Sequence, residues 1–350
     1  MFKIANSNTD THTTTIDYSM VSPRSPIWLD CDPGHDDAFA MLLAAHLPQF
    51  ELVGVSTVYG NAPLSRTTLN ALALAEAFAV APVRVWPGAD KPLKRALSNA
   101  PEIHGESGLD GTSLLPKATL ADAAGPVGSA VGALAAAIEA HAGEIYVVVT
   151  GTLTNIALLA TERPDLLCKI KHLSIMGGGF AEGNWTKFAE FNIWCDPEAA
   201  RMVLRHPELA GRTTLVTLDM THQAIATPEV QARVLGSSDG KDGDVFYVRR
   251  MLYELLQFFA KTYRDHFGFD AGPPVHDPLA VAALLTDESG AGLGLEFGEY
   301  ELDVILDGER VGETVKVRPS AKGVKVLEKI DMERFWELIY QSLDNLEKNR

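Results

Sequence analysis

The sequence is poor in cysteine and in basic residues, and it has no long apolar run. Its three cysteines, Cys31, Cys168 and Cys195, are odd in number and widely spaced, which argues against a disulfide framework or a zinc site. They are typical of reduced intracellular thiols. Lysine and arginine number 30 against 46 acidic residues, so the net charge is −16. We therefore expect no nucleic-acid partner and no anionic membrane surface, because both require a basic patch.

No segment predicts a membrane span, because the most apolar stretches, residues 71–81 and 127–138, are too short or contain Glu76. Residues 1–24 are rich in Thr, Ser and Asp. They lack the apolar core of a signal peptide and the arginine bias of a transit peptide. We predict a flexible N-terminal tail over residues 1–24, a single domain over residues 25–350 and a cytoplasmic location.

Four carboxylates fall within eight residues: Asp30, Asp32, Asp36 and Asp37. The pattern around them predicts a buried strand, a Pro-Gly turn and then a helix over residues 38–47. Asp36 or Asp37 alone would be an ordinary helix cap. Capping does not explain Asp30 and Asp32, which share one side of the strand and are expected to meet the other pair. Such a cluster requires a cation, and oxygen ligands favour a hard one, Ca²⁺ or Mg²⁺.

Strands and helices alternate along most of the chain. Apolar segments at residues 52–58, 83–86, 145–150, 172–176 and 214–218 predict strands, separated by helical segments such as 64–78 and 127–141. Strands at 300–306 and 314–318 and a helix at 332–346 follow. This order predicts an α/β fold with a mainly parallel central sheet flanked by helices. Functional residues are then expected at the carboxyl ends of the strands.

Polar residues do follow these strands. Asn61 comes directly after the strand at 52–58, and a glycine turn follows Thr150. A glycine run at 177–179 leads into a loop whose side chains suit hydroxyl groups. The side chains of interest in this loop are Glu182, Asn184, Glu190 and Asn192.

Seven motifs in order resemble those of the nucleoside hydrolases, the inosine-uridine-preferring ribohydrolase family. They lie at residues 30–37, 59–61, 103–108, 150–155, 176–179, 189–192 and 276–278. The resemblance runs from about residue 27 to the last helix. The segment 108–111 and the N-terminal tail are most similar to the uridine ribohydrolases of yeasts and fungi.

The resemblance implies a single α/β domain with Ca²⁺ at the strand ends, and relatives that are usually dimers or tetramers. It implies a metal site formed by Asp32, Asp37, Asp277 and the backbone carbonyl of Thr150. It places Asp36, Asn61, Met176, Asn184, Glu190 and Asn192 around the ribose. His276 matches the residue proposed to protonate the departing base.

The chemistry of the reaction agrees with these residues. Breaking an N-glycosidic bond builds positive charge on the sugar, which a carboxylate-rich pocket stabilises. Asp32 is the natural general base. His104 belongs to a motif loop beside the expected substrate site, and His35 is interpreted as a spacer that touches solvent or a neighbouring subunit.

The nucleobase site is less defined by the sequence. Tyr263 and His266 lie on a predicted helix, residues 245–266, that could reach the base, although an aromatic at helical spacing is more often a core residue. Uridine, inosine, cytidine and nicotinamide riboside all remain open as substrates.

Two other functions compete with hydrolysis of ribonucleosides. A phosphatase of the haloacid dehalogenase type also places Asp-x-Asp after a first strand, but Gly34 stands where that family has Thr or Val. A calcium-dependent nucleoside binder without turnover would keep the same pocket. Retention of Asp32 and His276 favours the enzyme.

Overall fold

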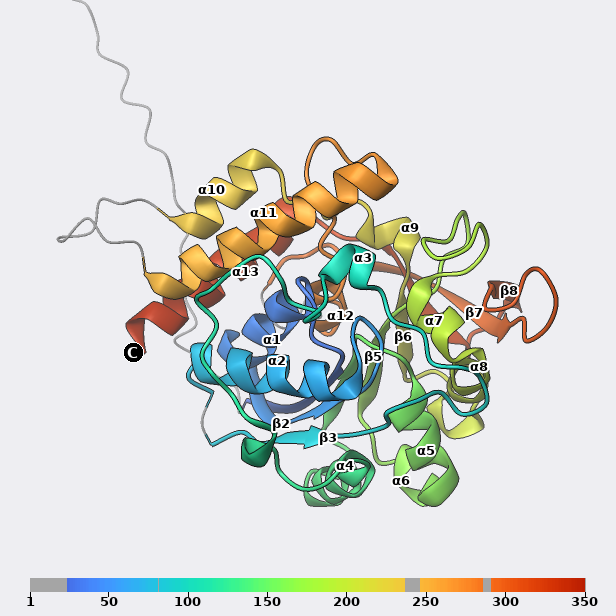
Figure 1. Ribbon diagram of the computed structural model, residues 1–350. Coiled ribbons are helices and arrows are strands. Elements are labelled where there is room, and N and C mark those ends of the chain that lie inside the picture. Colours follow the sequence, from blue (N-terminus) through green and yellow to red (C-terminus); the bar gives the residue numbers. More distant parts are fainter. Residues whose placement is uncertain (1–23, 81, 237–245, 286–290, 350) are drawn as a thin grey trace, which may run out of the picture.

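The computed structural model describes residues 24–80, 82–236, 246–285 and 291–349. Within these residues, one sheet has the strand order β3-β2-β1-β4-β5-β6-β9-β7-β8 (Figure 1). The strands are β1 (Ser25–Cys31), β2 (Phe50–Thr57), β3 (Val85–Pro87), β4 (Tyr146–Val149), β5 (His172–Met176), β6 (Thr213–Val216), β7 (Glu296–Val304), β8 (Thr314–Pro319) and β9 (Val324–Lys329). The N-terminal tail predicted for residues 1–24 lies, except for Arg24, outside the described residues.

Helices cover both faces of the sheet (Figure 1). They are α1 (Asp37–His46), α2 (Leu64–Ala77), α3 (Pro101–His104), α4 (Ser129–Ala140), α5 (Thr154–Glu162), α6 (Pro164–Leu167), α7 (Phe191–Cys195), α8 (Pro197–Leu204), α9 (Leu218–Thr221), α10 (Pro228–Leu235), α11 (Tyr247–Phe267), α12 (Pro278–Ala282) and α13 (Met332–Lys348). None of the helices in the described ranges is long and apolar enough to cross a membrane.

Alternation along β1 divides the core into two layers. Leu29 packs with Phe39 of α1 and Leu279 of α12 on one face. Its neighbour Trp28 packs with Leu134 of α4 and other residues on the opposite face. This is the expected pattern of a strand buried on both sides, where successive side chains point in opposite directions.

The predicted α/β fold with a mainly parallel sheet is confirmed. The strands from β3 through β1, β4 and β6 to β9 pair in parallel, and β7 runs antiparallel to both β8 and β9. The sequence analysis missed β9, in which Lys and Glu interrupt a short apolar run. Strand β9 pairs with β6 through Lys325 and Val326 and with β7 along its length. Its place in the sheet therefore depends on these pairings more than on the hydrophobic pattern of its own residues.

The topology fixes where a ligand can bind. Strand β1 lies between β2 and β4, and from this point the chain builds the sheet outward in both directions. A reversal of strand order separates the loops at the carboxyl ends of the two central strands and opens a crevice between them. The residues after β1 and β4, including Asp32 and Thr150, lie at this crevice.

Candidate active site

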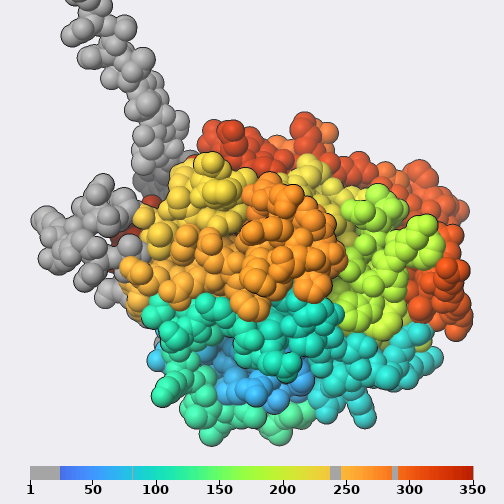
Figure 2. Space-filling view, turned by 45° about the horizontal axis from the view of Figure 1, so that its top comes forward, coloured from blue at the N-terminus to red at the C-terminus, as the bar shows by residue number. Residues whose placement is uncertain are grey.

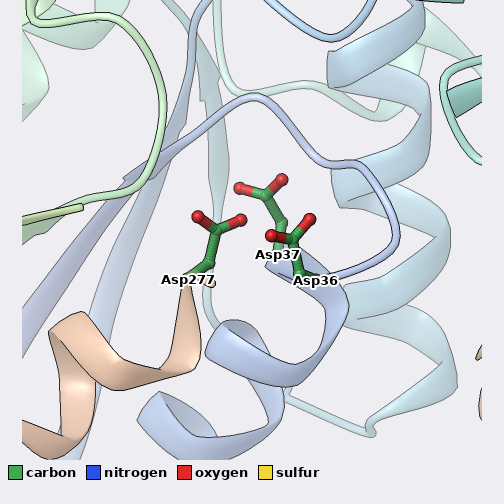
Figure 3. A group of neighbouring side chains, drawn as sticks. All are labelled: Asp36, Asp37 and Asp277. Carbon is green, nitrogen blue, oxygen red and sulfur yellow. The ribbon is translucent and has the colours of Figure 1, made fainter. Parts of the chain in front are cut away.

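Three carboxylates meet at the N-termini of two helices. Asp36 and Asp37 begin α1, and Asp277 precedes α12 (Figure 3). One oxygen from each lies within 4.8 Å of the others, and all three residues are buried. Neither Asp36 nor Asp277 accepts a capping hydrogen bond from its own helix. The three carboxylates therefore face one another in the geometry of a metal site, and helix capping does not account for them.

Asp32 lies beside this group and is held by the backbone. Its Oδ2 accepts a hydrogen bond of 2.7 Å from the amide of Asn61, whereas Oδ1 is buried without a hydrogen-bond partner. The close approach requires glycine on both sides. A Cβ at Gly60 would lie 1.9 Å from Oδ2, and one at Gly151 would lie 2.5 Å from Oδ1. Both glycines thus serve to admit the Asp32 carboxylate.

Asp37 is held by residues that follow the ends of β1, β2 and β4. Its Oδ1 accepts from the Thr150 hydroxyl at 2.7 Å, and its Oδ2 accepts from the amide of Gly34 at 2.8 Å and from Asn61 Nδ2 at 3.3 Å. The backbone carbonyl of Thr150 accepts from Asn192 Nδ2 at 2.8 Å. These contacts bring the motifs at residues 30–37, 59–61, 150–155 and 189–192 to one place.

Burial raises the pKa of every carboxyl group in this region. It raises the pKa of Asp36 to about 7 and that of Asp32 and Asp277 well above the usual value, and the neighbouring carboxylates add to the effect. Asp37 shifts in the same direction, also through burial. The cavity above contains no lysine or arginine in the described chain. These carboxylate oxygens, among them Oδ1 of Asp32 without a hydrogen-bond partner, are ligands that fit a hard divalent cation.

Asp30 does not join the group, contrary to the expectation that four carboxylates would meet. Its Oδ1 accepts from Ser56 Oγ at 2.5 Å and from Asn155 Nδ2 at 2.7 Å. Ser56 in turn accepts from the indole of Trp28. Asp30 therefore faces the α4 and α5 layer with Trp28. The alternation argument fails for Asp32 because β1 ends at Cys31, so Asp32 lies outside the strand in irregular backbone.

A cavity of about 350 Å³ lies over the carboxylates. This is within the usual range for small-molecule sites, about 300–1,000 Å³. Its lining includes these residues that the sequence placed in the site: Asp36, Asn61, His104, Thr150, Met176, Asn184, Glu190, Asn192, Tyr263, His276 and Asp277. Asp32 and Asp37 are not part of the lining and lie beneath it, in contact with Asn61.

Glu190 links the cavity wall to helix α7. Its carboxylate caps the helix, accepting from the amides of Asn192 and Ile193, and also accepts from the amide of Gly178. Three such donors stabilise the charged form, although burial raises the pKa. Asn184 is fixed by a bond from the amide of Phe191 at 2.9 Å. Two polar side chains are thus oriented before any ligand binds.

His276 is held between two hydroxyl groups. Its Nδ1 lies 2.7 Å from Thr221 Oγ1, and its Nε2 lies 2.7 Å from the Tyr263 hydroxyl. The structure therefore places Tyr263 in the site through a direct contact with His276. The sequence analysis missed Thr221, whose only signal was its position after β6. Burial lowers the pKa of His276 well below its ordinary value.

Aromatic side chains line the outer part of the cavity. Trp185 and Phe191 pack with ring centroids 4.9 Å apart, and Phe259, His266 and Phe267 line it from α11. Figure 2 shows part of the teal segment between β3 and α4 lying directly against the orange segment of α11, and α3 contacts α11. Trp185 and Phe259 were not identified from the sequence, because aromatic residues in loops and amphipathic helices give the same pattern as core residues.

His35 is not a surface spacer, and this prediction was wrong. The side chain is fully buried, and its ring stacks on both Phe258 and Phe259 at centroid distances of 5.1 and 5.0 Å. Its Nδ1 lies 3.2 Å from Nδ1 of His104. The long loop between β3 and α4 carries His104 back over the turn after β1, which sequence spacing alone does not reveal.

Known proteins share both the sequence and this architecture. The model of the inosine-uridine preferring nucleoside hydrolase family matches residues 27–337. A uridine nucleosidase of Saccharomyces cerevisiae is 40% identical, over 94% of this chain and 98% of its own length. An inosine-uridine preferring nucleoside hydrolase of Crithidia fasciculata is 38% identical, over 91% of this chain and 98% of its own.

A solved structure agrees with these matches. The purine-preferring ribonucleoside hydrolase from Gardnerella vaginalis superposes with a TM-score of 0.81 at 25% identity, covering 93% of this chain and 100% of that one. The fold and site define an enzyme of the N-glycosidase type. The chain belongs to the inosine-uridine preferring nucleoside hydrolase family, as the motifs predicted.

The carboxylate group predicts that a divalent cation stabilises the fold. Adding Ca²⁺ or Mg²⁺ to chelator-treated protein should raise Tm, since a ligand at a hundredfold its Kd adds about 2.7 kcal/mol. Differential scanning calorimetry measures this shift. Asp37→Asn and Asp277→Asn should reduce it strongly, whereas Asp270→Asn, at an exposed acid outside the group, should retain it. An equal shift in all three variants would contradict binding at these carboxylates.

Proposed function

We propose that this chain hydrolyses the N-glycosidic bond of ribonucleosides, uridine and inosine among them, to free base and ribose in a Ca²⁺-dependent reaction of nucleoside salvage. The observation that carries the proposal is the buried group of carboxylates, without a basic partner in the described chain, at the floor of a ligand-sized cavity. The names of the relatives support the choice of substrates. The enzyme is proposed to be cytoplasmic and to form a homodimer or homotetramer.

The ribose is proposed to bind at the inner end of the cavity. Asp36, Asn61, Met176, Asn184, Glu190 and Asn192 supply its contacts. Glu190 and Asn184 are already oriented by backbone donors, so little reorganisation is required when hydroxyl groups bind. The carboxylates also stabilise positive charge that develops on the sugar as the bond to the base breaks.

The cation would be held by Asp32, Asp37, Asp277 and the carbonyl of Thr150. When bound, Ca²⁺ would supply coordination positions for sugar hydroxyls and lower the pKa of water. The three carboxylates that lie within 4.8 Å of one another in the structure are Asp36, Asp37 and Asp277, so this group contains Asp36 and not Asp32. The unpartnered Oδ1 of Asp32 nevertheless supports a role for this residue, because a buried carboxylate oxygen without a donor is costly.

Asp32 is proposed as the general base that takes the proton from the attacking water. Its Oδ2 is occupied by the amide of Asn61, which leaves Oδ1 for this task. Burial and the charge of Asp37 raise its pKa well above the ordinary value, so the proposed cation would be needed to keep the carboxylate ionised as a base.

His276 is proposed to protonate the departing base. It lines the cavity, and Thr221 and Tyr263 hold both ring nitrogens in place. Burial lowers the pKa of His276, which disfavours the protonated form, so substrate binding would have to offset this effect for the ring to act as the acid. The aromatic outer cavity, with Trp185 and Phe259, suits the planar face of a nucleobase.

Release of free ribose tests the proposal. Purified protein should release ribose from uridine and from inosine, lose this activity after chelation and regain it with Ca²⁺. Binding of ribonucleosides by metal-replete protein without ribose release would indicate the non-catalytic binder. The family match already removes the phosphatase interpretation.

The ribose contacts predict strict selectivity for the 2′-hydroxyl. Deoxyuridine should show a kcat/KM lower than that of uridine by at least about a hundredfold, because polar groups arranged for the hydroxyl are left unpaired. Steady-state assays of the two nucleosides measure this ratio. Comparable values would refute the assignment of the polar inner end to the ribose.

Replacing the proposed base should abolish most of the turnover. Asp32→Ala should lower kcat by at least about 10²-fold, because proton abstraction from water loses its acceptor. Asp30→Asn is a matched control at a buried carboxyl that binds Ser56 and Asn155 outside the cavity lining, and it should cost much less. A smaller loss for Asp32→Ala than about 10²-fold would remove Asp32 as the base.

The role of His276 predicts a dependence on the leaving group. His276→Ala should lower the rate with inosine far more than the rate with nitrophenyl riboside, whose leaving group departs without a proton. The ratio of the two kcat values in wild type and variant measures this difference. Equal losses on both substrates would exclude His276 as the acid and leave it a structural residue.

A further inference from the structure

Two buried histidines form a hydrogen-bonded pair, one member of which lines the cavity. His35 Nε2 lies 2.8 Å from the backbone carbonyl oxygen of Asp110, and His35 Nδ1 lies 3.2 Å from His104 Nδ1. His104 lines the cavity and is 7% exposed. Within the described chain, no residue donates to or accepts from Nε2 of His104. The hydrogen-bonded pair is therefore held at one end by the carbonyl of Asp110, and at the other end Nε2 of His104 faces the cavity without a partner in the described residues.

The contact with the carbonyl of Asp110 determines which nitrogen of His35 carries a proton. A carbonyl oxygen only accepts, so Nε2 of His35 must donate to Asp110. The ring is fully buried against Phe258 and Phe259, which disfavours a charged imidazolium. A neutral ring has only one N–H. Nδ1 of His35 is consequently an acceptor.

The second histidine follows from the first. Facing an acceptor at 3.2 Å, Nδ1 of His104 must carry its proton and donate. Burial also lowers the pKa of His104, so its ring is neutral as well. The ring lies against Gly34, where the lack of a side chain makes room for it, since an added Cβ would lie 2.5 Å from Nδ1 of His104. Nε2 of His104 is then left with an unshared lone pair.

We propose that His35 is a positioning residue that holds His104 in the Nδ1–H tautomer, so that Nε2 of His104 accepts a hydrogen bond from a ring N–H of the bound nucleobase. The inference rests on the proposed function for its substrate. It names the base class: the bases of uridine and inosine both carry a ring N–H, whereas the base of cytidine has none. It also separates His104, an acceptor, from His276, the proposed acid.

The tautomer itself can be observed without any substrate. In protein labelled with ¹⁵N-histidine, NMR shifts distinguish protonated from unprotonated ring nitrogens, and His104→Phe identifies the signals of His104 among the ten histidines. Nδ1 of His104 should be protonated and Nε2 unprotonated. In His35→Phe, which keeps an aromatic ring between Phe258 and Phe259, this single tautomer should be lost. Protonated Nε2 in the wild type would overturn the proposal.

The substrate contact is tested by 3-methyluridine, which lacks the ring N–H of uridine. Wild type should prefer uridine by at least about tenfold in kcat/KM, since an acceptor that meets a methyl group loses its partner. His104→Phe should remove most of this preference. His46→Phe makes the same exchange at a histidine bonded to the carbonyl of Phe78, outside the cavity lining, and should retain the preference.

The outcomes separate the two levels of the proposal. If wild type hydrolyses both nucleosides equally, or if His104→Phe keeps the preference, the contact with the base is refuted while the hydrolase stands. If wild type hydrolyses neither, the proposed function fails, and the NMR experiment still decides whether His35 fixes the tautomer. Should His35→Phe not fold, His35→Leu also removes the acceptor, and the single tautomer of His104 should again be lost.

Discussion

Mutual repulsion among buried carboxylates is the constraint on which this structure depends. Asp36, Asp37 and Asp277 face one another without a cationic side chain in the cavity lining, and Asp32 lies beside them with one oxygen unpaired. Burying such a group costs several kcal/mol unless a cation or protons neutralise it. The surrounding fold, with glycines that admit Asp32 and strand ends that hold Asp37, maintains an arrangement that the carboxylates alone would not adopt.

The sequence predicted the parts of the site that lie close together along the chain or belong to recognisable motifs. The strand, turn and helix around residues 27–47 have strong local patterns, and many of the motif residues line one cavity. The order of strands and helices sufficed for the parallel sheet. Local pattern and topology therefore predicted the layout of the molecule, whereas the roles of the site residues came from the motifs and stay predictions.

The remainder depends on contacts between distant segments. His35 meets His104 and Asp110 because a loop of irregular backbone folds back over the first turn, and no periodicity records this. Asp32 does not share the side of the sheet that Asp30 faces because β1 ends at Cys31, a boundary finer than pattern analysis resolves. The bond between Tyr263 and His276 joins a helix to a loop. Each of these requires the tertiary structure.

The distance along the chain between the two halves of the carboxylate group has a consequence for synthesis. The backbone amide of His276 donates to Asp36 across 240 positions, and Asp277 follows directly. During translation, the segment with β1 and α1 leaves the ribosome long before α12 is made. The carboxylate group and His276 thus come together only when about four-fifths of the chain exists. A chain that ends before residue 277 lacks part of the cavity, so activity at this cavity requires at least about four-fifths of the chain.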